Sequence, residues 1–296
     1  MKRKLAIITV AGLLLIGLSA VWVAGSVLSS PAPWPIGAMP ADLKGQSVEF
    51  ASTSGETLRG WLIPGHKGAG AIVLLHGLRG SRLQMVGRAR FLSAAGYTVL
   101  LFDFQAHGES TGKQITFGYL ESRDAQAAVN FLRASLPGEK IGVIGLSMGG
   151  AAAVLATPQL NVDAMSLEMV YPSISQAIAD RLTMRLGGWG STLTPLLSWQ
   201  LKPRIGVGAD ALRPVDKVSE ITIPKLFIAG AEDHHTTLAE SRQFFNAAAQ
   251  PKEFWVLPGA DHTDPHGVAP QEYERRILDF FEQPLRKQSR KANLNH

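Results

Sequence analysis

The sequence predicts an α/β protein with a mostly parallel central sheet, helices on both faces of that sheet and an inserted helical cap, preceded by one N-terminal transmembrane helix. Three observations support this prediction. Short apolar runs alternate with helical patterns along most of the chain, residues 171–223 interrupt that alternation, and residues 5–28 carry no charge. Strands that alternate with helices are typical of βαβ units in a parallel sheet.

The composition excludes several classes of protein. Of the 296 residues, 46% are hydrophobic and 18% are charged, which suits a folded chain with a sizeable core rather than a disordered one. The absence of cysteine excludes disulfides, cysteine-based metal sites and thiol nucleophiles. Lys and Arg number 29 against 24 acids, but clusters at 2–4 and 286–291 hold the excess. We therefore expect no nucleic-acid partner, because a body that binds nucleic acid would carry the positive charge itself.

Residues 5–28, LAIITVAGLLLIGLSAVWVAGSVL, are predicted to anchor the chain in a membrane. As a helix they would extend roughly 36 Å at about 1.5 Å per residue, against a hydrocarbon core of about 30 Å. The basic residues at 2–4 keep the N-terminus in the cytoplasm and place the rest of the chain, after residue 28, on the extracytoplasmic side. The alternative is a signal peptide cleaved at Val23-Ala24-Gly25, which would give a secreted or periplasmic protein.

Three further segments complete the domain organisation. Residues 29–45 contain four prolines and no periodicity, so we expect a stiff linker that lifts the body away from the membrane. The body covers 46–285 and contains the cap at about 171–223. Residues 286–296 form a basic tail, which we expect to be solvated.

The elements of the body follow from local patterns. Two apolar runs around the turn residues 52–57 predict a β-hairpin. Buried parallel strands are expected at the apolar runs 71–77, 97–104, 140–147, 162–170, 225–230 and 252–259. Helical spacing, with Gly or Pro as the stop, predicts helices at 85–96, 119–136, 148–157, 237–249 and 270–283.

The motif Gly145-Leu146-Ser147-Met148-Gly149 predicts a nucleophilic serine. This G-x-S-x-G pattern lies where a predicted strand meets a predicted helix, the context in which a sharp turn exposes the serine hydroxyl. The alternative is an ordinary tight turn in which Ser147 caps the helix.

A nucleophilic serine needs a base, and the base needs an orienting acid. Asp233 and His262 each follow a predicted strand, so we expect them at the same sheet edge as Ser147. The order Ser…Asp…His is that of one known fold. Several neighbours compete for these roles: Glu168, Glu232, Asp261 and Asp264 as the acid, and His234, His235 and His266 as the base. We expect His76 and His107 to be hydrogen-bonded loop residues.

The chain resembles the α/β-hydrolases over residues 46–285. The resemblance rests on five features in the right order: His76-Gly77-Leu78, the segment DFQAHGES at 103–110, GLSMGG at 145–150, the Asp233 loop and the His262 loop. Within that superfamily the chain is similar to membrane-anchored Bem46-like and serine-aminopeptidase-like (S33-type) esterases. It departs from them at Ala106, where relatives usually have Gly, so this loop is expected to differ in shape.

The resemblance implies the α/β-hydrolase fold and acyl transfer by Ser147, His262 and Asp233. The backbone N–H groups of Leu78 and Met148 are expected to form the oxyanion hole. No cofactor and no metal is expected. The expected substrates are carboxylic esters, either small molecules or lipids near the membrane. A peptidase or aminopeptidase, a thioesterase and a non-catalytic binding protein on the same scaffold remain alternatives. The sequence leaves the oligomeric state open.

Overall fold

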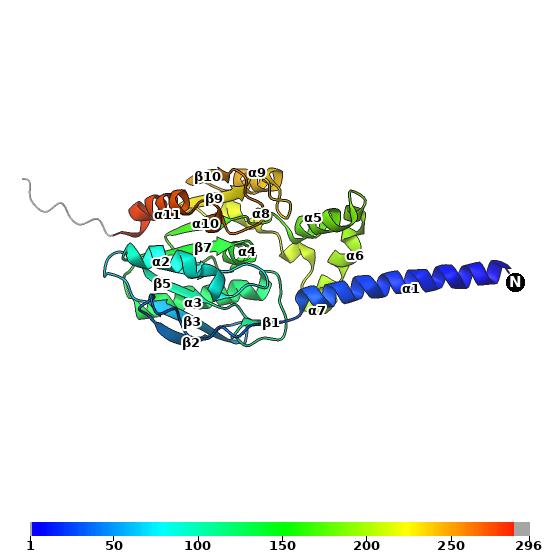
Figure 1. The fold of residues 1–296 in the computed structure, drawn as a ribbon, viewed down its shortest axis with the longest axis horizontal. Coiled ribbons are helices and arrows are strands. Elements are labelled where there is room, and N and C mark those ends of the chain that lie inside the picture. The colour runs from blue at the N-terminus through cyan, green and yellow to red at the C-terminus, as the bar shows by residue number, and fades with distance from the viewer. Residues whose placement is uncertain (1, 287–296) are drawn as a thin grey trace, which may run out of the picture.

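An eight-stranded sheet forms the centre of the protein (Figure 1). The computed structural model describes residues 2–286. The strands follow the order β10-β9-β8-β7-β4-β5-β3-β2 across the sheet. Their bounds are β2 (Gln46–Ala51), β3 (Thr57–Ile63), β4 (Ala71–Leu75), β5 (Thr98–Phe102), β7 (Ile141–Leu146), β8 (Ala164–Glu168), β9 (Lys225–Gly230) and β10 (Lys252–Leu257).

The sheet is parallel except at one edge. β4, β5, β7, β8, β9 and β10 run in the same direction, while β3 is antiparallel to both β2 and β5. The β2–β3 pair is the predicted hairpin, with Gln46 opposite Leu62 and Ala51 opposite Thr57. The mostly parallel α/β sheet that the sequence predicts is confirmed.

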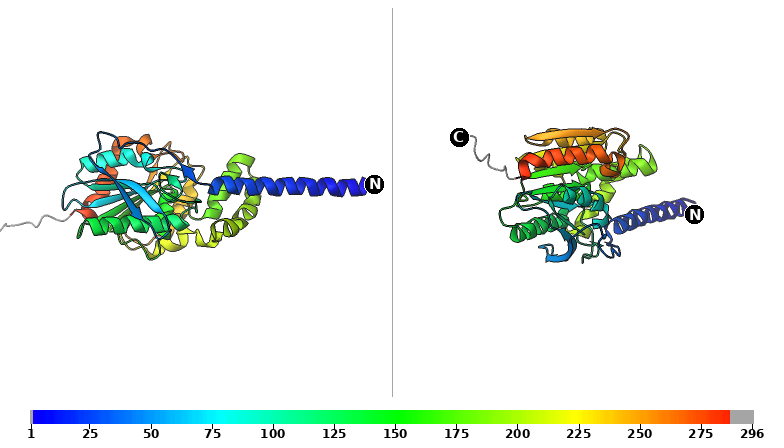
Figure 2. Two further views of the ribbon diagram at one scale, coloured as in Figure 1. Left: turned by 90° about the horizontal axis from the view of Figure 1, so that it is seen from below. Right: turned by 60° about the vertical axis from the view of Figure 1, so that its left-hand side comes forward.

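Helices cover both faces of this sheet, as the views in Figure 2 show. One hydrophobic cluster contains side chains of α3, α4 and α9, and a second contains side chains of α2 and α11. Successive residues of β4 belong to different clusters: Val73 belongs to the first cluster, and Ile72 and Leu74 belong to the second. The bounds are α2 (Val86–Ala94), α3 (Tyr119–Ser135), α4 (Met148–Leu155), α9 (Leu238–Ala247), α10 (Pro265–Val268) and α11 (Pro270–Leu285), with the 3-10 helix η1 (Arg82–Met85) before α2. The strand β4 thus has apolar side chains on both faces of the sheet, and helices cover both faces, as is usual for a parallel strand.

The segment between β8 and β9 is the cap, and it consists of short helices. They are α5 (Ile174–Leu186), η2 (Gly190–Leu193), α6 (Thr194–Trp199), α7 (Leu201–Ile205), η3 (Ala209–Ala211), α8 (Pro214–Lys217) and η4 (Val218–Glu220). The cap begins after the carboxyl end of β8, at the edge where the candidate catalytic residues lie. The chain then returns to the opposite edge of the sheet to enter β9, the parallel neighbour of β8.

The Pro-rich segment 29–45, expected to be a stiff linker between membrane and body, packs against the body. β1 (Ala32–Pro33) pairs in parallel with β6 (His107–Gly108). The apolar side chains of Ile36 and Leu43 are buried in the second hydrophobic cluster. The burial of these two side chains and the backbone pairing hold the segment against the body. Both interactions offset the conformational entropy that the segment loses when it becomes ordered.

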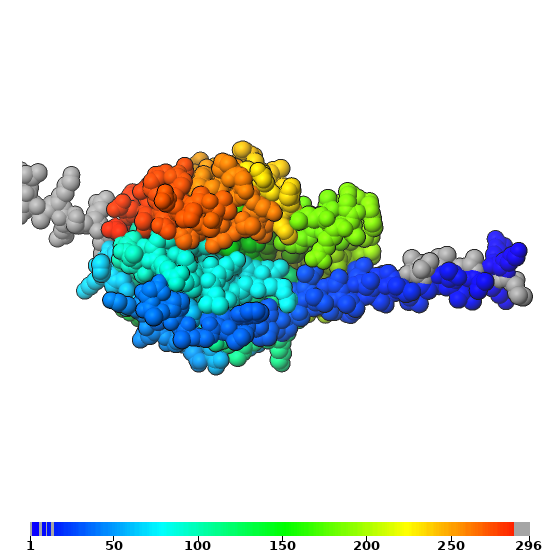
Figure 3. Space-filling view, viewed as in Figure 1, coloured from blue at the N-terminus to red at the C-terminus, as the bar shows by residue number. Residues whose placement is uncertain are grey.

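The N-terminal helix α1 (Lys2–Ser29) contains the expected membrane segment at 5–28. Across residues 2–286, no helix is both long enough and apolar enough to cross a membrane. The structure therefore does not support the expected transmembrane helix or signal anchor. Figure 3 shows α1 extending from the body beside the cap.

Candidate active site

Ser147 lies in a strained turn between β7 and α4. Its backbone has φ 50° and ψ −114°, a conformation that a non-glycine residue rarely adopts. The neighbouring glycines make the turn possible. A Cβ at Gly145 would lie 2.6 Å from the Cα of Gly150, and one at Gly149 would lie 2.4 Å from the carbonyl oxygen of Leu75. Glycine is thus required on both sides of the serine, because neighbouring backbone atoms leave no room for a side chain at Gly145 or Gly149.

The three predicted catalytic residues form a continuous hydrogen-bonded chain. The Oγ of Ser147 is 3.1 Å from Nε2 of His262, and Nδ1 of His262 is 2.7 Å from Oδ2 of Asp233. The other carboxylate oxygen, Oδ1, accepts the backbone N–H groups of His235 and Thr236, each at 2.8 Å. A carboxylate held in this way keeps the proton of the imidazole on Nδ1, which leaves Nε2 free to accept the serine proton.

These residues meet at the carboxyl ends of three parallel strands. Ser147 follows β7, Asp233 follows β9 and His262 follows β10. Ser147 and Asp233 are buried, and the His262 side chain is only 16% exposed. Charge that develops here is poorly screened by water, which strengthens each electrostatic interaction.

Glu168, the main rival as the acid, is occupied elsewhere. One of its oxygens is 2.5 Å from the Arg88 guanidinium, and the other accepts the hydroxyl of Tyr273 at 2.5 Å. Its burial raises the pKa of this carboxyl, while the charge of Arg88 opposes that rise. Glu168 is therefore part of a buried ion pair and not the partner of His262.

The other rivals are not part of the hydrogen-bonded chain from Ser147 through His262 to Asp233. Asp261 accepts the backbone N–H of His262 at 2.7 Å and that of His234 at 3.4 Å. The His266 ring is 2.9 Å from the carboxylate of Glu274. The His235 ring lies against that of His262, with their centroids 5.0 Å apart. The exposed Glu232 instead donates its backbone N–H to the Ala260 carbonyl.

Arg88 is a site residue that sequence reasoning missed. Its guanidinium is fully buried and contacts both Glu168 and Asp264, the latter at 2.6 Å and two residues after His262. It therefore connects α2 to the loop that carries the base. The signal was available, because Arg88 follows Met85 by three residues and precedes Leu92 by four, on the apolar face of a predicted helix.

Leu78 and Met148, whose backbone N–H groups are the expected oxyanion hole, line the same cavity as Ser147. The N–H groups of Gly77 and Arg79, on either side of Leu78, are held by side-chain acceptors at 2.9 Å and 3.1 Å. Within residues 2–286, the N–H of Leu78 itself donates to no protein acceptor. Met148 is the first residue of α4, where helical N–H groups have no partner in the helix.

His76 and His107 hold the surrounding loops by both ring nitrogens. For His76, Nδ1 is 2.8 Å from the carbonyl of Gly77, and Nε2 accepts the N–H of Phe104 at 3.0 Å. For His107, Nδ1 is 2.8 Å from the carbonyl of Gln105. Burial lowers the pKa of both imidazoles. Both rings are therefore neutral, as a ring nitrogen that accepts an N–H must be.

Ala106 adopts the conformation that favours glycine. Its φ is +58°, in the left-handed region. Its backbone N–H donates to the carbonyl of Thr111 at 2.9 Å. The loop therefore has a backbone shape suited to glycine, and Ala106 is strained there because its Cβ lies close to the following carbonyl oxygen.

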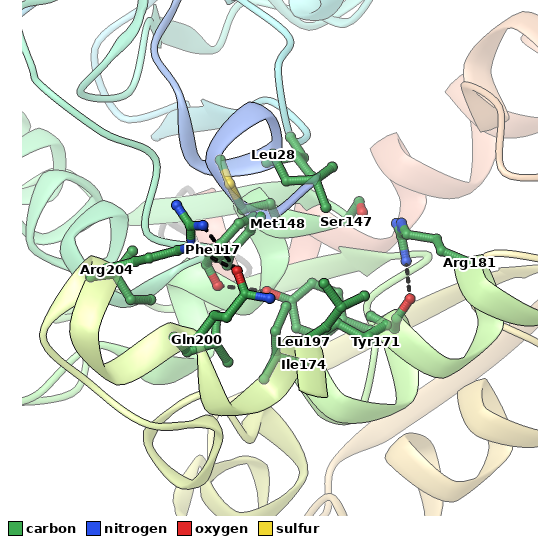
Figure 4. A pocket seen from close by; sticks show the side chains of 16 residues that line it. Leu28, Phe117, Ser147, Met148, Tyr171, Ile174, Arg181, Leu197, Gln200 and Arg204 are labelled. Atoms are coloured by element: carbon green, nitrogen blue, oxygen red, sulfur yellow. Dashed lines mark hydrogen bonds between the residues drawn. The ribbon is translucent and has the colours of Figure 1, made fainter. Parts of the chain in front are cut away.

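Two cavities open at Ser147. The first has a volume of about 70 Å³ and an apolar lining that includes Leu28, Phe117, Ile174 and Leu197 (Figure 4). The second has a volume of about 300 Å³ and a more polar lining: Gln84, Arg181, His235, His262 and Asp264. An ester bound with its carbonyl carbon at Ser147 would thus have an apolar space on one side and a wider polar space on the other.

No metal site accompanies these residues in the part of the chain from residue 2 to 286. There, no group of three His, Asp or Glu side chains is arranged to hold a metal ion. The adjacent histidines at 234 and 235 are thus not part of such a group.

Comparisons with known proteins agree with this architecture. Residues 72–276 match the sequence model of the alpha/beta hydrolase family. The uncharacterized protein YqkD of Bacillus subtilis is 24% identical over 237 residues, which cover 78% of this chain and 77% of YqkD. The uncharacterized protein YfhR of Escherichia coli is 25% identical over 273 residues, covering 88% and 85%. The esterase Pf2001 of Pyrococcus furiosus superposes with a TM-score of 0.72 at 25% identity, covering 86% of this chain and 98% of the esterase.

Proposed function

Since the chain belongs to the alpha/beta hydrolase family, we propose that it is a serine esterase that cleaves carboxylic esters through an acyl-enzyme. One observation carries the proposal: the hydrogen-bonded chain from Ser147 through His262 to Asp233, at a strained turn between a strand and a helix. Such a chain activates a serine that is otherwise a weak nucleophile.

Acylation begins when Nε2 of His262 takes the proton of Ser147 as its Oγ attacks the ester carbonyl carbon. The carbonyl oxygen becomes negative and accepts hydrogen bonds from the N–H groups of Leu78 and Met148. Asp233 stabilises the imidazolium that forms. When the tetrahedral intermediate collapses, the C–O bond to the alcohol breaks, and His262 gives its proton to the departing alkoxide.

Deacylation repeats these steps with water as the nucleophile. His262 takes a proton from water, the resulting hydroxide attacks the acyl carbon, and Ser147 leaves with the proton returned by His262. The products are a carboxylic acid and an alcohol. The residues named here supply all the proton transfers.

Esters fit the site better than peptides do. An aminopeptidase would need acidic side chains that face the site to hold the substrate amine. Asp264 lines the polar cavity, but its carboxylate is paired with Arg88 at 2.6 Å. Asp180 in the cap and Glu240 on α9 line neither cavity at Ser147. The apolar lining on one side of Ser147 suits an acyl chain, and the structural neighbour Pf2001 is described as an esterase. The lipid or acyl substrates that the sequence suggested belong to the same class.

Labelling with a fluorophosphonate probe tests whether Ser147 is an activated nucleophile. We expect strong labelling of the wild type and none of Ser147→Ala. His262→Ala should label at least 100-fold more slowly, since general-base assistance contributes about 10²–10⁴. His266→Ala is the matched control and should label like the wild type. A folded wild type that does not react would support the non-catalytic binding protein instead.

A substrate panel separates the esterase from its catalytic alternatives. We would compare p-nitrophenyl esters, acyl thioesters and aminoacyl p-nitroanilides at equal concentration. Higher kcat/KM for the esters supports the proposal. A preference for the anilides would favour the peptidase, and a preference for the thioesters would favour the thioesterase.

The site of action is a separate proposal, and it comes from the basic residues at 2–4 followed by the apolar residues 5–28. We propose that the catalytic domain works outside the cytoplasm. Protease added to intact cells should then degrade this domain, whereas a cytoplasmic control protein should survive.

A further inference from the structure

The C-terminal turns of α1 form part of the wall of the apolar cavity at Ser147. Gly25 and Leu28 line this cavity together with cap residues, although they precede Ser147 by more than a hundred positions. In Figure 4 the side chain of Leu28 lies beside Ser147 and Met148, across the cavity from Ile174. The N-terminal helix therefore borders the apolar space beside Ser147 and is not only an appendage of the domain.

The cap holds this end of α1 by several polar contacts. The guanidinium of Arg204 donates to the hydroxyl of Ser26 at 2.7 Å and to the carbonyl of Trp22, and it lies 4.0 Å from the centre of the Trp22 ring. The amide of Gln200 donates to the carbonyl of Val21 at 3.1 Å. Arg204 and Gln200 also line the cavity, so the contacts that fix α1 border the space for the substrate.

The opposite side of the cavity holds α1 as well. Arg79, next to the oxyanion residue Leu78, donates to the carbonyl of Val27 at 3.0 Å. The backbone N–H of Ile115 donates to the carbonyl of Ser29 at 2.8 Å. The end of α1 is thus connected to the cap on one side and to the loops of the body on the other.

Helix and cap approach each other as closely as a glycine allows. A Cβ at Gly25 would lie 2.5 Å from Oε1 of Gln200 and 2.9 Å from Nε of Arg204. Leu28, one turn later, is the larger side chain that α1 presents to the cavity. The cavity is small, about 70 Å³, so each side chain of its wall, including that of Leu28, takes up space that a bound chain could use.

We propose that α1 determines the acyl-chain length that the enzyme accepts, with Leu28 as the specificity-determining residue and the contact at Gly25 holding the helix in place. This inference rests on the proposed esterase function. The acyl group of the ester occupies the apolar cavity, where Leu28 limits the space, and the alcohol occupies the wider polar cavity. The enzyme as it stands prefers short acyl groups, and removing the Leu28 side chain opens the site to longer ones.

Chain-length profiles of Leu28→Ala and of a matched control test the proposal. Val27→Ala is the control, because Val27 is the preceding residue of the same helix and its side chain is exposed. We would measure kcat/KM for p-nitrophenyl butyrate and p-nitrophenyl decanoate with the full-length protein. The decanoate-to-butyrate ratio should rise about tenfold or more in Leu28→Ala, since a single methylene in a pocket is worth roughly 10–200-fold. Val27→Ala should keep the wild-type ratio.

The outcomes distinguish this inference from the proposed function. An unchanged ratio in a folded, fluorophosphonate-reactive Leu28→Ala would overturn the role of α1 and leave the esterase intact. An equal rise in Val27→Ala would also overturn it, because the effect would then not depend on the cavity wall. Loss of both hydrolysis and labelling in the wild type would instead defeat the proposed function.

A second measurement needs no variant. An alkyl fluorophosphonate that carries a diazirine at the end of its chain is attached to Ser147 of the wild type, and the protein is irradiated and digested. We expect the cross-link on residues 21–29 or on the cap helices that face them. Cross-links confined to residues around the second cavity would overturn the assignment of the acyl chain to the apolar cavity.

Discussion

Replacing Arg88 by Met removes the cation from the buried network behind the His262 loop. Arg88 contacts Glu168 at 2.5 Å and Asp264 at 2.6 Å, and its Nε donates to the hydroxyl of Tyr273 at 2.7 Å. Arg88, Glu168 and Tyr273 are buried. Met has similar length and no charge, so it fills most of the space but leaves Glu168 without its ion-pair partner.

The expected cost is large because one charge stays behind. Breaking a buried ion pair by removing one partner typically costs about 3–5 kcal/mol. The total stability of a domain is about 5–15 kcal/mol, so the variant should lose a substantial part of its free energy of unfolding. Adding Glu168→Gln removes the stranded charge. The double variant should therefore recover most of the loss, since a buried pair replaced on both sides is often nearly neutral.

The loss should also depend on pH. Burial raises the pKa of Glu168 and Arg88 lowers it, so removing Arg88 raises this pKa further. An acid whose pKa is higher in the folded than in the unfolded state stabilises the fold at low pH. That stability is lost as the pH rises towards the folded-state pKa. The deficit of Arg88→Met should thus be smallest near the unfolded-state pKa of a glutamate and should grow towards neutral pH.

Urea denaturation followed by tryptophan fluorescence measures these differences, and ester hydrolysis measures the effect on the His262 loop. We expect kcat to fall in both variants, because the contact between Arg88 and Asp264 is lost in both. A single variant that loses less than about 1 kcal/mol, the scale of an exposed ion pair, would refute the argument. So would a double variant less stable than the single one.

Three further changes test other parts of the structure. Asp233→Ala should lower kcat for ester hydrolysis on the order of 10⁴-fold, because His262 loses its orienting acid, and an unchanged kcat would remove Asp233 from the catalytic group. Ala106→Gly should raise the free energy of unfolding in urea by about 1 kcal/mol, since it relieves a left-handed alanine, and a decrease would contradict this assignment of strain. Asp180 has its pKa raised from 3.8 to about 7 by burial and by Glu240. The wild type should therefore lose stability as the pH rises between these values. Melting temperatures of Asp180→Asn should lack that decrease, and parallel pH profiles for the two proteins would argue against it.

Local patterns were sufficient to predict the sheet and the candidate catalytic residues. Apolar runs bounded by Gly and Pro mark buried strands, because a strand covered on both faces excludes polar residues. Parallel strands place their carboxyl ends at one edge, so residues that follow separate strands come together there. This is why Ser147, Asp233 and His262 could be named from chain order, and why the structure brings them within hydrogen-bond distance.

Charged partners could not be assigned from the sequence. Glu168 ends a strand beside the cap and satisfied the same positional rule as Asp233. Only the fold shows that Arg88 and Tyr273 occupy both of its oxygens. The choice depends on which side chains α2 and α11 direct at Glu168, and helix packing is not encoded in the strand pattern.

By itself the sequence determined the parallel sheet, the turn that carries Ser147 and the chain order of the acid and the base, because each follows from local periodicity or from the geometry common to parallel sheets. It also indicated a membrane anchor at 5–28, which the structure does not support, and a stiff linker at 29–45, whose Ile36 and Leu43 side chains are buried against the body. Only the tertiary structure decided that Leu28 of α1 shares a cavity with Leu197 of the cap beside Ser147. The physical reason is that this cavity is made by contacts between segments far apart in the chain, whose packing no local pattern records.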